Sequence, residues 1–249
     1  MLYQAHRGAA TEFPENTLPA FVASKNQGYH IIECDPRFTA DGQCVIHHDA
    51  TINRTLRTEA GETLVEPTPI NQVTYEQLQS YDAGLWMGEE FRGTKVPLLR
   101  EVLAFAAEVE IPIKLDNLFS YFSEELRETL FREVEESGAQ VGFTCADEET
   151  VRAVVERFPS AEIHYDGAVT EEAILTVRGL LKNNPLTVWI PLDCPGTSWC
   201  KLPKATEALC TMVKGYARLG IWLLDTQEQL EQAYAFGADI IETNGALKP

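Results

Sequence analysis

Several features that mark particular protein classes are missing from this chain of 249 residues. No apolar run is long enough to cross a membrane, and the first residues carry neither the basic nor the apolar segment of a secretory signal. Basic residues are scarce: 20 Lys and Arg stand against 38 Asp and Glu, which gives a net charge of −18. Such an acidic protein is a poor partner for nucleic acid or for an anionic membrane surface. We therefore expect a cytoplasmic protein without stable membrane association.

Cysteine motifs are also missing. The chain has 6 cysteines, but no Cys-x-x-Cys pair and no Cys/His group with the spacing of a zinc site. We expect free thiols, and a disulfide between Cys194 and Cys200 is the less favoured alternative.

What the sequence does contain is a regular alternation of short apolar segments and helical patterns. The strands are expected at residues 2–6, 30–35, 111–116, 140–144, 161–165, 186–190, 219–224 and 238–243. Strands that alternate with helices imply parallel pairing, and eight such units predict an α/β fold of the (β/α)8 TIM-barrel type. Because no linker divides the chain, residues 1–249 are expected to form a single domain.

Two segments interrupt this alternation after the second expected strand. Residues 44–48 follow the turn signal Asp41-Gly42, which predicts a β-hairpin with the end of that strand. Residues from about 50 to 95 show no strong periodicity. A long irregular segment inside a compact domain is usually functional, so we expect an insertion of about 45 residues into the barrel.

The end of the second strand carries the first candidate for a site. Glu33 and Asp35 are two residues apart, so both side chains point to one face of the strand. Two adjacent carboxylates repel each other unless a cation or a shared proton neutralises them, and an all-oxygen pair suits Ca²⁺ or Mg²⁺. With a two-residue turn, His48 lies opposite Asp35 on the same face. A loop one residue longer would exchange His48 with His47.

In (β/α)8 barrels the active site lies at the C-terminal ends of the strands. His6, Glu33, Asp35 and Asp116 all occupy such ends in this interpretation, and His48 joins them through the hairpin. We therefore expect these side chains to converge on one face.

Several motifs together resemble those of the glycerophosphodiester phosphodiesterases. They are HRG at 6–8, PENT at 14–17, Glu-x-Asp at 33–35, Asp-Gly at 41–42, His-Asp at 48–49, Arg-Thr at 54–55, DAGLWMGEEFRGTKVPLLREVL at 82–103 and GADIIETN at 237–244. The resemblance covers nearly the whole chain. It implies a (β/α)8 barrel that cleaves phosphodiesters with one divalent cation, Ca²⁺ or Mg²⁺.

The resemblance also implies roles for particular residues. His6 and His48 resemble the paired acid/base histidines, and Glu33 and Asp35 resemble two metal ligands. It further implies that Arg7 contacts the phosphate, that Glu15 lies next to the metal ligands and that Trp222 packs over the substrate.

One strand departs from the family pattern, which usually has Glu-x-Lys with the Glu on the metal and the Lys on phosphate. If Asp116 takes the place of that Glu, a third metal ligand is kept and Leu118 replaces the Lys. Lys114 then lies one layer deeper on the same face, where it either contacts phosphate or pairs with Asp116. In the second alignment Lys114 replaces the metal ligand outright, and metal binding is impaired. We prefer the first alignment.

The function expected from the resemblance is metal-dependent hydrolysis of small glycerophosphodiesters to sn-glycerol 3-phosphate and an alcohol, with the two histidines as general acid and base. One alternative is phospholipase-D-like cleavage of lysophospholipids, and another is a catalytically weak phosphodiester-binding protein. The sequence leaves open the alcohol group, the metal, which histidine is the acid, and whether the protein is a monomer or a homodimer.

Overall fold

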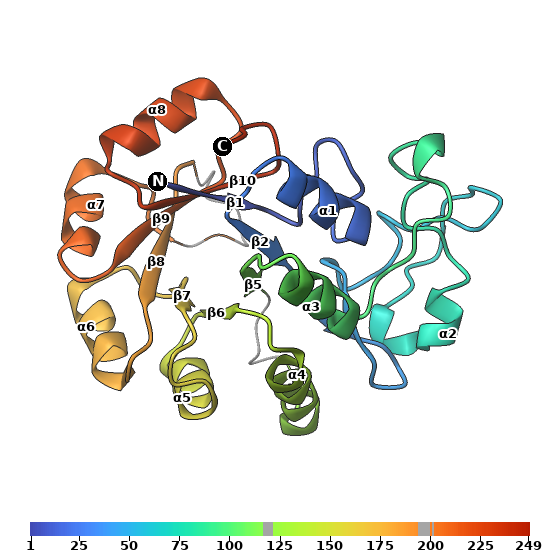
Figure 1. The fold of residues 1–249 in the computed structure, drawn as a ribbon, viewed down its shortest axis with the longest axis horizontal. Helices are drawn as coiled ribbons and strands as arrows, with labels where there is room; N and C mark the ends of the chain where they lie inside the picture. The colour runs from blue at the N-terminus through green and yellow to red at the C-terminus, as the bar shows by residue number, and fades with distance from the viewer. Residues whose placement is uncertain (117–121, 194–199, 201) are drawn as a thin grey trace.

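A closed barrel of parallel strands forms the centre of the molecule (Figure 1). The computed structural model describes residues 1–116, 122–193, 200 and 202–249. The barrel strands are β1 (Leu2–Ala5), β2 (Ile31–Cys34), β5 (Ile113–Leu115), β6 (Val141–Cys145), β7 (Ile163–Tyr165), β8 (Leu186–Pro191), β9 (Arg218–Trp222) and β10 (Ile240–Thr243). They pair in the order β1-β10-β9-β8-β7-β6-β5-β2, which confirms the predicted (β/α)8 barrel.

Helices surround the barrel on its outside (Figure 1). They are α1 (Leu18–Asn26), α3 (Leu99–Glu108), α4 (Glu124–Ser137), α5 (Glu148–Arg157), α6 (Glu171–Leu180), α7 (Glu207–Lys214) and α8 (Gln227–Ala235). Side-chain oxygens of Asp147, Thr170 and Thr206 accept backbone N–H bonds at helix starts, where unpaired N–H groups need acceptors.

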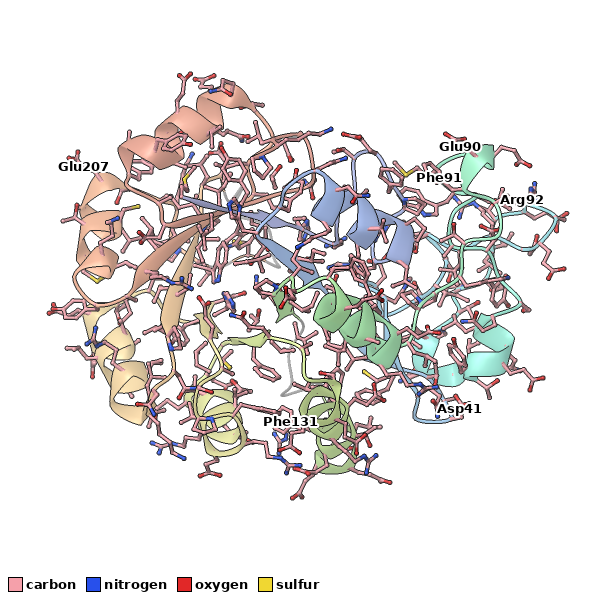
Figure 2. The ribbon with its side chains drawn as sticks, viewed as in Figure 1. Asp41, Glu90, Phe91, Arg92, Phe131 and Glu207 are labelled. Atoms are coloured by element: carbon pink, nitrogen blue, oxygen red, sulfur yellow. The ribbon has the colours of Figure 1, made fainter. Side chains whose placement is uncertain are left out.

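Aromatic packing joins the helix layer to the barrel. Phe131 of α4 meets Phe143 of β6 edge-on at 5.9 Å between ring centroids, and Phe158 at 5.2 Å (Figure 2). Burial of such a ring stabilises the fold by roughly 2 kcal/mol. This layer fixes the strands whose C-terminal ends carry the site.

The predicted hairpin is present, but its predicted register is wrong by one residue. β3 (Pro36–Phe38) pairs antiparallel with β4 (Cys44–Ile46), and the backbone N–H of His47, not His48, donates to the carbonyl of Asp35. The turn is longer than two residues because the Thr39 N–H pairs with the carbonyl of Gln43. β4 ends at Ile46, so the strict alternation of faces no longer applies to the residues that follow.

The segment after the hairpin has a small hydrophobic core of its own. It contains the short helices η1 (Ile70–Gln72), α2 (Tyr75–Leu78) and η2 (Glu89–Phe91), and lies at one side of the barrel in Figure 1. The core side chains are Val45, Ile52, Leu56, Ile70, Val73, Leu78, Ala83, Val96 and Leu98. Phe91 also contacts Phe13, 5.7 Å away in the loop after β1. These contacts fix the segment against the β1 side of the barrel.

The remaining expectations concern membranes and thiols. Within the described ranges, no helix combines the length and the apolar character that a membrane crossing requires. Cys34, Cys44, Cys145 and Cys210 are free, as expected. Cys200 is disulfide-bonded, so the expectation of a free thiol is wrong there. Cys194 lies outside the described residues.

Candidate active site

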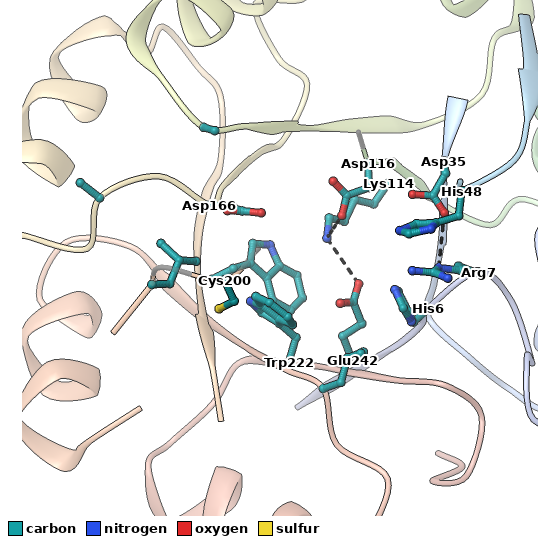
Figure 3. Close-up of a pocket in the computed structure, with 15 residues that line it drawn as sticks. His6, Arg7, Asp35, His48, Lys114, Asp116, Asp166, Cys200, Trp222 and Glu242 are labelled. Carbon is teal, nitrogen blue, oxygen red and sulfur yellow. Dashed lines mark hydrogen bonds and ion pairs between the residues drawn. The ribbon is translucent and has the colours of Figure 1, made fainter. Parts of the chain in front are cut away.

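A pocket of about 700 Å³ opens at the C-terminal ends of the barrel strands (Figure 3). Its lining includes most of the side chains that the sequence singled out: His6, Arg7, Asp35, His48, Lys114, Asp116 and Trp222. The two imidazoles and Arg7 lie on one side of the pocket, with Trp222 and Cys200 opposite. Glu33 is fully buried behind this lining, and Glu15 lies behind Arg7. The structure therefore brings the predicted site residues together, without assigning their roles.

The loop after β1 presents Arg7 in a strained conformation. Arg7 has a φ of +57°, in the left-handed region, which costs a non-glycine residue about 1–2 kcal/mol. Its backbone N–H donates to Glu33 Oε2 at 2.7 Å, and its carbonyl accepts from the N–H of Asn16 at 2.9 Å. Gly8 follows with φ +83°, and a Cβ there would meet Ala20 at 2.8 Å. The His-Arg-Gly sequence thus turns the chain so that both His6 and Arg7 reach the pocket.

The guanidinium of Arg7 is held between two carboxylates. Its Nη1 donates to Glu15 Oε1 at 2.9 Å, and its Nε lies 3.5 Å from Asp35 Oδ2. That buried Nε makes no hydrogen bond to any described residue. The guanidinium is thus a fixed positive charge in the pocket wall, and such a charge attracts an anion.

His6 is oriented by an amide at the end of β10. Its Nδ1 lies 2.7 Å from Asn244 Oδ1, and Asn244 Nδ2 donates to Asp225 Oδ2 at 2.7 Å. Because the carboxylate accepts from the amide nitrogen, the amide oxygen must face the imidazole. Oδ1 can only accept, so Nδ1 carries the proton and the neutral ring has its lone pair on Nε2.

His48 is oriented by a carboxylate. Its Nδ1 lies 2.6 Å from Asp49 Oδ1, which again places the Nδ1 proton toward the acceptor. Arg54 from the insertion donates to Asp49 through Nε at 2.7 Å and to both oxygens of Glu15 at 2.7 Å. Although burial acts in the opposite direction, the bonds from Arg54 and the charge of Arg7 lower the pKa of Glu15 to about 2. A chain of alternating charges therefore joins His48 to Arg7.

Two adjacent carboxylates at the end of β2 differ in how they are paired. Asp35 Oδ2 accepts from Asn16 Nδ2 at 2.8 Å. Glu33 Oε2 accepts from Arg7, whereas its Oε1 is buried without a hydrogen-bond partner among the described residues. Burial, and then the charges of Asp35 and Asp116, raise the pKa of Glu33 well above its usual value. The charge of Lys114 acts in the opposite direction but does not outweigh these effects.

Lys114 lies at the centre of the pocket floor. Its side chain is 4% exposed, and its Nζ is 3.3 Å from Glu242 Oε1 and 3.5 Å from Asp116 Oδ2 (Figure 3). The Nζ also lies 4.6 Å from the ring centroid of Trp189. Burial acts to lower the pKa of Lys114, but Glu242 and Asp116 outweigh it and the pKa is raised, so the ammonium form is strongly favoured. The lysine is thus a fixed positive charge. Leu118, the other candidate for the lysine position, lies outside the described residues.

The sequence interpretation missed several residues that take part in the site. Glu242 and Asp166 line the pocket, and Asn244 and Asp225 support His6. Glu242 lies in β10 and Asp166 directly follows β7, so the rule that barrel sites form at strand ends would have selected both. Burial and then the charge of Asp116 raise the pKa of Asp166 to about 7. Glu242 and Asn244 also lie in the GADIIETN motif at 237–244, to which the sequence analysis gave no residue roles, whereas Asp225 lies in none of the quoted motifs.

The divalent cation that the resemblance implies would need several oxygen ligands at one place in the pocket. Across the described part of the chain, no three His, Cys, Asp or Glu side chains stand together as a ready metal cluster. The donor types nevertheless fit a hard cation: the unpaired Glu33 Oε1 lies in a group of mutually repelling carboxylates that includes Asp35 and Asp116. Asp116 differs from the other two because it contacts Lys114. We conclude that the oxygen donors of Glu33 and Asp35 fit a cation. The third candidate ligand, Asp116, is already paired with Lys114.

A comparison with known families finds one match. The model of the glycerophosphoryl diester phosphodiesterase family matches residues 6–173, a range that includes every predicted site residue except Trp222.

Two relatives carry related names. The chain is 35% identical over 112 residues to a glycerophosphodiester phosphodiesterase of Caldanaerobacter subterraneus, over 45% of this chain and 43% of that protein. It is 33% identical over 114 residues to glycerophosphodiester phosphodiesterase 1 of Homo sapiens, over 45% of this chain and 32% of that protein. The matches thus span less than half the length of these relatives.

Solved structures share the fold over nearly the whole chain. A phosphodiesterase of Oleispira antarctica, in complex with the product sn-glycerol-3-phosphate, has a TM-score of 0.75 at 18% identity, over 99% of this chain and 94% of that one. A glycerophosphodiester phosphodiesterase of Agrobacterium tumefaciens has a TM-score of 0.70 at 19% identity, over 98% and 96%.

Proposed function

The chain belongs to the glycerophosphoryl diester phosphodiesterase family, and from that membership we propose that it hydrolyses a glycerophosphodiester to sn-glycerol 3-phosphate and an alcohol. The observation that carries this proposal is the pairing of two imidazoles with one arginine in a single pocket: His6, His48 and Arg7. Support for the substrate class also comes from the Oleispira structure, which holds sn-glycerol-3-phosphate.

The two histidines perform the proton transfers in this proposal. Both rings bind an acceptor through Nδ1, so both offer Nε2 to the pocket reaction. One Nε2 removes a proton from the attacking oxygen as the new P–O bond forms. The other ring, in its imidazolium form, gives a proton to the alcohol oxygen as the old P–O bond breaks. Arg7 binds a non-bridging phosphate oxygen with the donor that Glu15 and Asp35 leave free.

Glu33, Asp35 and Asp116 are the residues that would hold one divalent cation, Ca²⁺ or Mg²⁺. Such an ion, when bound, offsets negative charge on the phosphoryl group. Asn16 keeps Asp35 in place, and Glu33 is aligned by the Arg7 backbone. The remaining proposed roles are phosphate binding by Lys114, packing over substrate by Trp222, and support of Arg7 by Glu15.

The experiment is hydrolysis of glycerophosphocholine and glycerophosphoethanolamine by the purified full chain, first with EDTA and then with Ca²⁺ or Mg²⁺ restored. We expect sn-glycerol 3-phosphate as product, and a loss of at least about 100-fold in kcat in His6→Ala and in His48→Ala. His30→Gln is the matched control, because the His30 ring accepts the Tyr3 N–H and does not line the pocket. Full activity of both pocket variants would overturn the two-histidine proposal.

The product also distinguishes the alternatives that the sequence left open. Choline released from lysophosphatidylcholine without sn-glycerol 3-phosphate would indicate phospholipase-D-like chemistry. Binding of glycerophosphodiesters without turnover, measured by calorimetry, would indicate a binding protein.

A further inference from the structure

The floor of the pocket contains more carboxylates than its buried cation can neutralise. Lys114 Nζ contacts Glu242 Oε1 and Asp116 Oδ2, and its register partner across the β2–β5 ladder is Glu33. Asp166 adds a further acidic group near Asp116. Since like charges at close range destabilise each other, a second cation at this floor is electrostatically favoured.

The negative charges of Glu242 and Glu33, at the two ends of this acidic group, are compensated to different degrees. Glu242 accepts from Lys114 and from Gln4 Nε2. Glu33 is completely buried, and its Oε1 has no hydrogen-bond partner among the described residues. The carboxylates are therefore less well compensated on the Glu33 side than on the Glu242 side. Asp116 is adjacent to both ends: its Oδ2 lies 3.5 Å from Lys114 Nζ, and its backbone N–H donates to the carbonyl of Cys34, the residue between Glu33 and Asp35.

Lys114 itself has little freedom to move away from this position. Its ammonium is packed against the face of Trp189, whose Nε1 donates to His164 Nδ1 at 3.1 Å. Gly220 lies behind that ring, where a Cβ would come within 2.5 Å of it. A cation over an indole face gains further electrostatic stabilisation. The ammonium group of Lys114 is consequently held in a fixed position at the bottom of the pocket.

We propose that Lys114 sets the affinity of this pocket for a divalent cation, because its ammonium competes with that cation for Asp116. The proposal concerns the same site as the proposed function and rests on it. The ion binds through Glu33 and Asp35, and Asp116 is shared between the ion and the lysine. The chain accordingly binds divalent cations more weakly than the same pocket without the lysine charge.

The test is calorimetric binding of Mn²⁺ and Ca²⁺ to the full chain without substrate. We expect Lys114→Met to bind roughly tenfold more tightly or better, because a positive charge beside the ion is removed. Lys25→Met is the matched control: Lys25 is exposed at the end of α1, and its loss changes net charge equally. Its affinity should stay within about twofold of the parent.

A double variant separates competition for Asp116 from a general change of charge. The variant that combines Lys114→Met with Glu242→Gln loses one positive and one negative charge, so the pocket keeps its net charge. It also avoids a buried carboxylate at position 242 that has lost the ammonium it was bonded to. We expect its affinity for Mn²⁺ to rise as in the single variant, and Asp116→Asn in that background to abolish the gain. Circular dichroism and a melting curve establish that each variant is folded.

Unchanged affinity in both lysine variants would overturn the proposal, and so would a gain confined to the single variant. Because the readout is metal binding without substrate, it is independent of turnover. Absence of glycerophosphodiester hydrolysis in the parent would refute the proposed function while leaving the calorimetric comparison interpretable.

Discussion

The two imidazoles of the pocket are held by different kinds of support. His48 donates to a charged carboxylate, Asp49, which is in turn held by Arg54 from the insertion. His6 donates to the neutral amide of Asn244 at the end of the barrel. A charged acceptor stabilises an imidazolium better than an amide does. We therefore expect the two histidines to differ in role. The imidazolium form is better stabilised at His48 than at His6.

The supports also differ in where they come from. The residues behind His6 belong to the strand ends β9 and β10, whereas Arg54 belongs to the segment that interrupts the barrel. Arg54 binds both Asp49 and Glu15, so a change there reaches His48 and Arg7 together. The insertion therefore contributes to the support of His48 and Arg7, whereas His6 is supported from the strand ends. Substitutions of the residues that support His48 and of the residue that supports His6 distinguish these two forms of support.

The largest effect is expected from Asp49→Asn. The amide cannot balance the charge of an imidazolium and can present an N–H to Nδ1, which forces the wrong tautomer. By comparison with His–Asp pairs of this kind, kcat should fall by about 10²–10⁴-fold with little change in KM. Asp41→Asn on the hairpin is the control, since Asp41 accepts from Thr39 and Tyr75 and does not line the pocket (Figure 2). A fall of less than threefold in Asp49→Asn would mean that the carboxylate does not act through His48.

Arg54→Met should have the next largest effect. The substitution keeps a long side chain but removes the bonds that fix Asp49 and Glu15, the carboxylates that hold His48 and Arg7. We expect roughly a 30-fold loss of kcat/KM, shared between kcat and KM, with partial recovery in Arg54→Lys. Arg92→Met, in the same segment, removes surface bonds to the carboxylate of Glu89 and the carbonyl of Glu59, none of which reaches His48 or Arg7, and should be nearly neutral (Figure 2). An equal loss in both variants would indicate a general loosening of the insertion instead.

Asn244→Ala should cost less, because it removes a neutral acceptor. His6 then loses its fixed tautomer but no charge, so kcat should fall by about tenfold. The ¹⁵N shifts of the ring report the tautomer directly, and in the parent they should show Nδ1 protonated. Asn26→Ala, at the exposed end of α1, is the control. A larger loss in Asn244→Ala than in Asp49→Asn would reverse the comparison between the two histidines.

The sequence predicted the side of the barrel on which His6, Asp35 and Asp116 meet, because parallel strands place their C-terminal ends at one edge. It did not predict the hairpin register, because Asp41-Gly42 is compatible with more than one loop length. The observed register pairs His47 with Asp35, yet His48 still lines the pocket because β4 has already ended. The bridges Arg54–Glu15 and Asn244–Asp225 connect residues 39 and 19 positions apart. Contacts of this kind leave no periodic signal in a sequence.

The smallest expected effect concerns the pH dependence of stability through Glu15. Its folded-state pKa is about 2, below the usual 4.5, so the folded state binds fewer protons than the unfolded state between these values. The stabilisation is therefore complete above about pH 4.5 and is lost as the pH falls toward 2. After allowance for the partly exposed Arg54, it amounts to about 1 kcal/mol. Melting curves of the parent and of Glu15→Gln should differ near pH 6 and converge as the pH falls below 4.5. A difference that stays constant down to pH 3 would show that Glu15 stabilises the loop by packing, and that its charge does not link the insertion to Arg7.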